Sequence, residues 1–318
     1  HATFVSLLGQ GDHVVAAKQI YGSVQHLLDK ILPRFGVEVT FVDATDPDAV
    51  AAAFTPRTRL LHIETIANPT IVVADLAALI ERAHRRGITV SVDNTFASPW
   101  LCRPAELGAD LVIEALTKWI GGHSDVLAGG VSGRADLIAA IRRVQIDTGG
   151  TLAPQSAFLV LRGIETLHVR MERHSSNALA LARHLEAGSL KTVRYPGLPS
   201  HPQYSVAQRE LNTGGGMMCF ELADRRAAET FLDALTLPPR TASLGSVRTI
   251  AVHPPSSTHR QMDSAELAQV GIPEGLVRVS VGLEDIDDLI ADFDQALAAT
   301  GTGAAREATQ VGAAGTGT

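Results

Sequence analysis

The chain has 318 residues, of which 45% are hydrophobic and 19% are charged, a composition typical of a folded globular protein. Its formal net charge of −7 argues against nucleic acid or an anionic membrane surface as an obligate partner, because both attract basic surfaces. The two cysteines lie far apart and match no metal-binding spacing, which favours a reducing cytoplasm, and no apolar run is long enough to cross a membrane.

The first half of the chain alternates short apolar runs with amphipathic segments. Five runs predict strands, at residues 13–17, 37–43, 59–65, 89–94 and 109–115. Three intervening segments carry apolar residues at helical spacing, at residues 23–35, 46–54 and 73–87. This alternation predicts an α/β fold with a mostly parallel sheet covered on both faces, whose ligands collect beyond the carboxyl ends of the strands.

The second half of the chain has a different pattern. A long helical region at about 154–187 leads into short strands and helices that predict a smaller α+β domain. We therefore expect a large domain at 1–165, a C-terminal domain at 166–300 and a disordered tail, rich in glycine, alanine and threonine, at 301–318. The chain opens inside what reads as a helix, so we also expect that part of the natural N-terminus is missing.

Polar side chains follow several predicted strands and should meet at one edge of the sheet. Taken singly, each has an ordinary structural explanation, because aspartate caps helices and Asn-Pro forms turns. Their common location is more informative than any one identity. These residues are Tyr21, Glu64, Asn68, Asp93, Asn94, Thr117 and Lys118.

Lys118 is one of only four lysines in the chain, against 23 arginines, and it follows the apolar run DLVIEAL. Burial there would lower its pKa and leave the neutral amine that Schiff-base chemistry needs, although a lysine reaching into solvent is the alternative. Asp93 would partner a ring nitrogen, Thr117 would donate to a phosphate and Tyr21 would stack on a ring. Together these four residues describe a pyridoxal-phosphate pocket.

A candidate for substrate binding lies in the predicted strand at 276–282. Its valines share one face and Arg278 lies on the other. A planar guanidinium is suited to holding a carboxylate, although an exposed strand arginine fits the same pattern. Ser243, in the turn-like stretch 241–247, is an additional candidate.

Six blocks of the sequence resemble, in order, the Cys/Met-metabolism enzymes that depend on pyridoxal phosphate. That family includes cystathionine γ-synthase, the cystathionine γ- and β-lyases, methionine γ-lyase and O-acetylhomoserine sulfhydrylase. The resemblance runs over about residues 2–300. The blocks are IETIANPT (63–70), VDNTFASP (92–99), LTKWIGGHSDVLAGG (116–130), LVLRGIETLHVRMERH (159–174), STHRQM (257–262) and GLVRVSVGLEDIDDLIADF (275–293).

The resemblance implies an aspartate-aminotransferase-like fold (PLP fold type I) and a homotetramer built as a dimer of dimers. By position, it makes Lys118 the Schiff-base lysine and Asp93 the partner of the ring nitrogen. It makes Tyr21 the tyrosine that stacks on the ring and also transfers protons. These roles agree with those suggested by the residues themselves.

The same resemblance assigns the remaining site residues. Asn68 would lie near the ring hydroxyl, and Thr117 would bind the phosphate. Arg278 and Ser243 would hold the α-carboxylate of an amino-acid substrate. No metal ligand is implied.

Three features depart from the family pattern. Ala115 stands where members usually have a serine that binds the phosphate. Members also carry an N-terminal segment, with a phosphate loop and a stretch that reaches the neighbouring subunit, which has no counterpart here. Ala242 stands where enzymes acting on cystathionine often have a glutamate.

The implied reaction is cleavage at Cγ of a sulfur amino acid or homoserine ester, as in methionine γ-lyase, giving 2-oxobutyrate, ammonia and a thiol. Ala242 favours a small or apolar γ-substituent, and the 275–293 block resembles methionine γ-lyase. Against this, Ser23 replaces a cysteine typical of those lyases, and the stretch 253–262 resembles O-acetylhomoserine enzymes. Replacement at Cγ, by an O-acetylhomoserine sulfhydrylase or a cystathionine γ-synthase, therefore stays open.

Three other functions are weighed against this one. Elimination at Cβ is a variant of the same chemistry. Ala115 and the expected missing segment motivate a non-catalytic fragment, but the retention of Lys118, Asp93, Tyr21 and Arg278 argues against it. A nicotinamide site is disfavoured, because no G-x-G-x-x-G motif follows a predicted strand.

Overall fold

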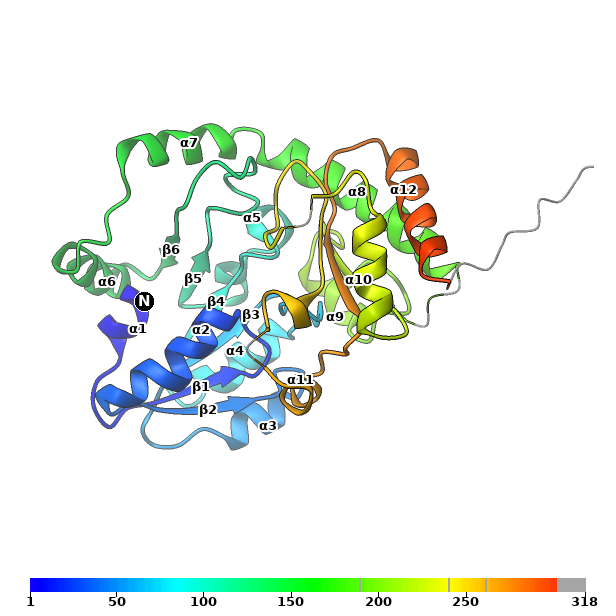
Figure 1. Cartoon of the computed structure of the whole chain (residues 1–318). Helices are drawn as coiled ribbons and strands as arrows, with labels where there is room; N and C mark the ends of the chain where they lie inside the picture. The colour runs from blue at the N-terminus through cyan, green and yellow to red at the C-terminus, as the bar shows by residue number, and fades with distance from the viewer. Residues whose placement is uncertain (189, 191, 240, 261, 302–318) are drawn as a thin grey trace, which may run out of the picture.

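The computed structural model contains two β-sheets, which are linked by a long helix (Figure 1). It describes residues 1–188, 190, 192–239, 241–260 and 262–301. Most of the predicted tail, from residue 302 onward, lies outside the described residues.

The larger sheet has six strands in the order β2-β1-β3-β4-β5-β6. Strands β1 to β5 are parallel, as the alternating pattern predicts, and β6 runs antiparallel to β5. All five predicted strands are present, whereas β6 was not predicted because its sequence, GVSG, has no apolar pattern. The strands are β1 His13–Ala17, β2 Glu38–Val42, β3 Thr58–Glu64, β4 Thr89–Asp93, β5 Leu111–Glu114 and β6 Gly130–Gly133.

Helices connect these strands, as expected for parallel neighbours. Helix α4 (Leu76–His84) is capped by Asp75, which accepts a hydrogen bond from the Ala78 N–H, and Gly87 follows its end with φ +66°. The α-helices of this half are α1 Ala2–Leu7, α2 Gly22–His26, α3 Pro47–Ala52, α4, α5 Ser98–Leu101, α6 Ala135–Asp147 and α7 Pro154–Ile164.

The segment 23–35 does not form the single regular helix that its pattern predicts. Only α2 is α-helical. It is followed by one turn of π-helix at Leu27–Ile31 and by a short 3-10 helix at Leu32–Phe35. Pro33 lies at the start of the 3-10 turn, where its missing N–H and fixed φ prevent an α-helix from continuing. A further 3-10 turn, Pro104–Leu107, precedes β5.

The second sheet has four antiparallel strands in the order β7-β8-β10-β9. Helices α10 (Arg225–Ala234) and α12 (Ile286–Ala299) pack together beside it. The rings of Phe220, Phe231 and Phe293 meet edge to face there, with centroids 5.3 to 6.4 Å apart. Such ring pairs add about 0.5–1.5 kcal/mol each beyond the area they bury. The strands are β7 Thr192–Arg194, β8 Met217–Glu221, β9 Ile250–Val252 and β10 Leu276–Ser280.

The predicted long helical region is two helices, α7 and the twenty-residue α8 (Leu167–Glu186), and α8 runs into the second sheet region (Figure 1). Residue 165 falls between them, but the division into domains at that point stays a prediction. The remaining helical elements are α9 Tyr204–Glu210, α10 Arg225–Ala234, the 3-10 turn Pro254–Ser256, α11 Ser264–Gln269 and α12 Ile286–Ala299. Within the described residues, no helix is both long and apolar enough to span a bilayer.

The two sheet regions meet where the loop 241–247 lies against the turn that carries Lys118. Gly245 has φ +76°, and a Cβ there would come within 2.5 Å of the Trp119 nitrogen. Only glycine allows both this backbone conformation and this approach. Trp119 anchors the turn, because its buried indole N–H donates to the Phe96 carbonyl at 3.0 Å. Lys118 and the loop residues 242–244, which are brought together here, line the cavity described next.

Candidate active site

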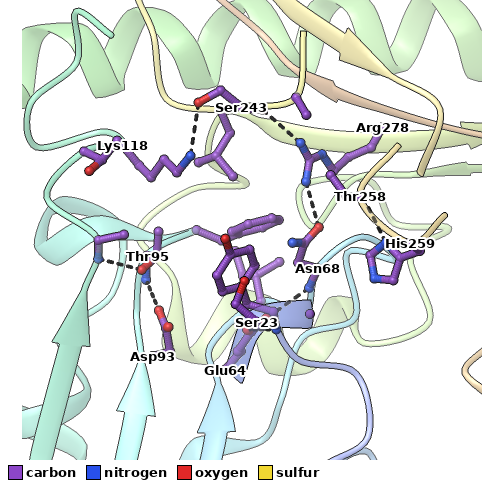
Figure 2. A pocket seen from close by; sticks show the side chains of 18 of the residues that line it. Ser23, Glu64, Asn68, Asp93, Thr95, Lys118, Ser243, Thr258, His259 and Arg278 are labelled. Atoms are coloured by element: carbon purple, nitrogen blue, oxygen red, sulfur yellow. Dashed lines mark hydrogen bonds between the residues drawn. The ribbon is translucent and has the colours of Figure 1, made fainter. Parts of the chain in front are cut away.

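A cavity of about 820 Å³ lies at the carboxyl ends of β3, β4 and β5 and is covered by the loop 241–247 and by β10 (Figure 2). This is the edge of the sheet at which ligands were expected. All but one of the residues predicted for the site line this one cavity, namely Tyr21, Glu64, Asn68, Asp93, Thr117, Lys118, Ser243 and Arg278. The prediction is wrong for Asn94, whose buried side-chain amide donates instead to the Cys102 carbonyl at 3.0 Å and to the Glu114 carboxylate at 2.9 Å.

Lys118 lies in the turn after β5, where its N–H bonds back to the Ala115 carbonyl at 2.9 Å. Its amine points into the cavity and donates to the Ser243 hydroxyl at 3.0 Å (Figure 2). Burial disfavours the ammonium and lowers the pKa of Lys118, and the nearby Arg278 guanidinium lowers that pKa further. The position therefore favours a neutral, nucleophilic amine, and the alternative of a solvated loop lysine is wrong.

Asp93 and Glu64 are register partners at the ends of β4 and β3, so their side chains lie next to each other on one face of the sheet. Burial raises the pKa of Asp93, while hydrogen bonds from Thr95, one of them from its N–H at 2.9 Å, act against that rise. Burial, followed by repulsion from Asp93, raises the pKa of Glu64 well above its ordinary value. Two carboxyl groups thus lie at the strand ends on one side of the cavity, and the Lys118 amine and the Arg278 guanidinium enter it from the turn after β5 and from β10.

Glu64 joins two segments that are far apart in the sequence. One carboxylate oxygen accepts the Tyr21 N–H at 2.6 Å, and the other accepts the Asn68 N–H at 3.1 Å. These two bonds lower the pKa of Glu64 and oppose the effect of burial. Glu64 was one of the strand-end candidates, but its sequence position gave no indication of these partners.

Arg278 is 2% exposed, so the alternative of an exposed strand arginine is wrong. Its Nη1 donates to Asn68 Oδ1 at 2.7 Å, and its Nη2 donates to the Ser243 carbonyl at 2.9 Å (Figure 2). Its Nε–H is buried and has no partner among the described residues, and the group forms no ion pair there. Burial lowers the pKa of Arg278 to about 10. A buried cation with a free N–H is suited to receive a carboxylate from a ligand.

The expected phosphate end of the cavity is less polar than the family pattern implies. The Thr117 hydroxyl donates to the Ala128 carbonyl at 3.3 Å and accepts the Ala128 N–H at 3.0 Å. Ala115 lines the cavity without a hydroxyl, and its N–H donates to the Thr95 hydroxyl at 2.9 Å. Lys118 and Arg278 are the only lysine and the only arginine among the described residues that line the cavity.

Several lining residues were not singled out from the sequence. Thr95 and Phe96 fall inside the block 92–99, and the Arg278 guanidinium lies 5.9 Å from the centre of the Phe96 ring. His259 falls inside the STHRQM block, where its Nδ1 lies 2.9 Å from the Thr258 hydroxyl. Burial lowers the pKa of His259 to about 4, so its ring is neutral at physiological pH. Membership of those blocks was the only signal that pointed to them.

The lowered pKa of Lys118 predicts a difference between lysines in the cofactor-free chain. Acetylation followed over a pH series by mass spectrometry should show Lys118 reaching its half-maximal rate at a lower pH than Lys30. Lys30 is a suitable reference, because a hydrogen bond with Asp29 raises its pKa. Since the Arg278 charge lowers the pKa of Lys118, Arg278→Gln should move the Lys118 curve, but not the Lys30 curve, to higher pH. Coincident curves in the unaltered chain would contradict this description of the cavity.

Comparison with known proteins extends over nearly the whole chain. L-methionine gamma-lyase of Pseudomonas putida is 45% identical over 303 residues, covering 94% of this chain and 76% of that protein. O-succinylhomoserine sulfhydrylase of Pseudomonas aeruginosa is 41% identical over 300 residues, covering 94% of this chain and 74% of that protein.

The fold has a close counterpart among solved structures. The crystal structure of cystathionine gamma-lyase from Lactobacillus plantarum complexed with L-serine superposes with a TM-score of 0.90 at 35% identity, over 94% of this chain and 79% of that one. The expected PLP fold type I is thereby confirmed. The sequence profile of the Cys/Met metabolism PLP-dependent enzymes matches residues 1–298. The cavity, the fold and these similarities agree, and the chain belongs to the Cys/Met metabolism PLP-dependent enzyme family.

Proposed function

We propose that this chain catalyses γ-elimination on L-methionine or a similar small thioether amino acid, releasing 2-oxobutyrate, ammonia and a thiol. The observation that carries the proposal is the pairing, in one cavity, of a lysine amine with lowered pKa and a buried arginine with a free Nε–H. The first can remove a proton from an amino acid, and the second can hold its carboxylate. The methionine gamma-lyase at 45% identity supports the choice of substrate.

The residues around the cavity fit the cofactor of the family. The Lys118 amine suits an aldehyde and the buried Asp93 suits a ring nitrogen. The Thr117 hydroxyl would donate to a phosphate in place of its 3.3 Å bond to the Ala128 carbonyl. When bound, pyridoxal phosphate supplies an aldehyde that reacts with amines and a ring that accepts electrons from Cα. We propose that these three residues, with Tyr21 and Asn68, hold it.

Arg278 is proposed to orient the substrate through its α-carboxylate. Asn68 and the Ser243 carbonyl already hold two of its nitrogens, so the guanidinium plane is fixed before the substrate arrives. Binding energy is then used to align the Cα–H bond and not to order the arginine. Ser243 links this group to the base, because its hydroxyl accepts from the Lys118 amine.

Lys118 is proposed as the base at Cα, since burial and the nearby Arg278 charge lower its pKa and so favour the neutral amine more than solvent would. Asp93 would hold the ring nitrogen of the bound cofactor in its protonated form, which lets the ring accept electrons from Cα. Tyr21, at the N-terminus of α2, is half exposed at the mouth of the cavity. Its phenol is proposed to give a proton to the departing γ-sulfur.

The residues near the entrance support a neutral substituent on the substrate. Ala242, Leu244, Ile31 and Leu127 line the cavity and offer apolar contact. Ala242 also lacks the charge that would meet a distal ammonium group. A thioether therefore suits this part of the cavity better than a second charged amino-acid moiety.

Replacement at Cγ is the second candidate. Ser23, in place of the cysteine of methionine γ-lyases, lines the same cavity, and a sulfhydrylase is 41% identical to this chain. An added thiol would then react where elimination would otherwise release the product. Both candidates use the same groups at Cα.

Product analysis distinguishes the two candidates. With added pyridoxal phosphate, L-methionine should give 2-oxobutyrate, whereas homocysteine formed from O-acetylhomoserine and sulfide, with no 2-oxobutyrate from methionine, would favour replacement. Lys118→Ala should lower kcat by about 10³-fold and Tyr21→Phe by about 10²-fold, the usual range for lost acid–base groups. Lys30→Ala is the matched control, because Lys30 is exposed and bonded only to Asp29 among the described residues. Full activity in Lys118→Ala would contradict the proposed mechanism.

We also propose that the chain forms a homotetramer built from dimers. Support comes from helix α7, which presents three exposed apolar side chains, Phe158, Leu161 and Ile164. In Figure 1 this helix lies along the outside of the molecule. Contiguous exposed apolar surface of this kind is typical of subunit interfaces.

Sedimentation velocity tests the assembly. The unaltered chain should sediment as a tetramer, and Leu161→Asp should shift it toward smaller species, because a charge would be buried in the interface. Phe35→Asp, which changes an exposed ring in the 3-10 turn after α2, should leave the assembly intact. A monomeric unaltered chain at micromolar concentration would refute the proposal.

The proposed location is the cytoplasm. Both cysteines, Cys102 and Cys219, are free and buried, and burial raises the pKa of each thiol to about 12. Such thiols are typical of a reducing compartment. Fractionation of the source cells tests this, and recovery outside the cytoplasmic fraction would contradict it.

A further inference from the structure

The side chain of Glu64 bonds to two segments that line the cavity, one containing Tyr21 and the other containing Asn68. Glu64 ends β3 and faces the cavity, with one oxygen bonded to the N–H of Tyr21 and the other to the N–H of Asn68. Tyr21 precedes Glu64 by 43 positions. We call this pair of bonds the Glu64 bracket. None of the roles assigned above includes it.

Few polar contacts of its own fix Tyr21 in place. Its side chain is 52% exposed, and no side chain caps the short helix α2 that it begins. Its carbonyl accepts hydrogen bonds from Val24 and Gln25, but those lie within the same local segment. The segment as a whole is anchored by the buried side chains of Ile20 and Leu28, and the bond from the Tyr21 N–H to Glu64 fixes Tyr21 itself relative to the end of β3. A bond from an N–H to a carboxylate is stronger than one to a neutral acceptor.

The other end of the bracket leads to the substrate side of the cavity. Asn68 receives the Glu64 bond at its backbone, and its side-chain oxygen accepts from Arg278 at 2.7 Å (Figure 2). One continuous chain of hydrogen bonds thus runs from Tyr21 through Glu64 and Asn68 to Arg278. Movement of Glu64 would alter the position of the ring-facing tyrosine and of the carboxylate-binding arginine together.

We propose that Glu64 is a positioning residue, which sets Tyr21 and Asn68 relative to each other and so fixes where the cofactor ring and the substrate carboxylate lie. This inference rests on the proposed function for its catalytic meaning, but the bracket itself exists without cofactor. Glu64 touches neither reacting atoms nor substrate in this assignment. Its effect passes through the two N–H groups that it binds.

An alternative explanation is purely electrostatic, because Glu64 also repels Asp93 across the strand pair. Glu114 is the matched control. It ends β5, is largely buried, has its pKa raised by burial to about 8, and also interacts with Asp93. Its side chain bonds to Asn94 and contacts neither end of the bracket. Glu64→Gln and Glu114→Gln therefore remove comparable buried carboxyl groups, and only the first breaks the bracket.

Hydrogen exchange on the cofactor-free full chain measures the bracket directly. In the unaltered chain the amides of Tyr21 and Asn68 should be protected. Glu64→Gln should speed their exchange about tenfold or more, because an amide nitrogen replaces one acceptor. Glu64→Asp, which keeps the charge but is too short to reach both N–H groups, should behave in the same way. Glu114→Gln should leave these two amides unchanged.

The second measurement uses the chain loaded with pyridoxal phosphate. The pH midpoint of the visible absorbance band reports the surroundings of the bound cofactor. It should shift by at least about half a unit in Glu64→Gln and Glu64→Asp, and by less in Glu114→Gln. In assays with L-methionine, the Glu64 variants should raise KM as well as lower kcat, because Arg278 is displaced too.

The outcomes separate the inference from the proposed function. If Glu64→Gln and Glu114→Gln shift the absorbance midpoint equally, or if Glu64→Asp matches the unaltered chain, the positioning role is overturned and charge alone is responsible. Unchanged exchange at both amides in a folded Glu64→Gln chain overturns it as well. If the unaltered chain acquires no absorbance band, the proposed function fails, whereas hydrogen exchange on the cofactor-free chain still decides whether Glu64 positions Tyr21 and Asn68.

Discussion

Burial of four charged groups around one cavity is the constraint on which the rest of this structure depends. Lys118 and Arg278 approach from the turn after β5 and from the second sheet, while Asp93 and Glu64 lie at the ends of two neighbouring strands. Isolated buried charges are costly, so each needs partners or must lose its charge. Here the lysine has a lowered pKa, the two carboxyl groups have raised ones, and the arginine is held by two oxygens.

The fold provides this arrangement by bringing distant segments together. The parallel sheet delivers the carboxylates at one edge, since register pairs Glu64 with Asp93. The close approach of Gly245 to the Lys118 turn brings the second sheet over that edge. The same loop carries Ser243, which bonds to Lys118 through its hydroxyl and to Arg278 through its carbonyl. The base and the carboxylate-binding group are therefore positioned by one short segment.

Local patterns predicted most of the sheet, because buried parallel strands are continuous apolar runs. The positions of polar residues after predicted strands, together with the family resemblance, named eight residues that line the cavity and one, Asn94, that does not. Three features needed tertiary information. Strand β6 has no apolar pattern and forms only against β5. The alternation around Arg278 is the same whether its face is buried or exposed. The two partners of Glu64 are backbone groups, which no side-chain pattern reveals.

The central claim is that the buried amine of Lys118 is the group to which the cofactor attaches. Reduction of the loaded chain with borohydride, followed by proteolysis and mass spectrometry, tests it most directly, because only four lysines compete for the label. The pyridoxyl mass should appear on the peptide that contains Lys118 and on no peptide from Lys18, Lys30 or Lys191. Label on one of those three lysines, or on none of the four, would contradict the account.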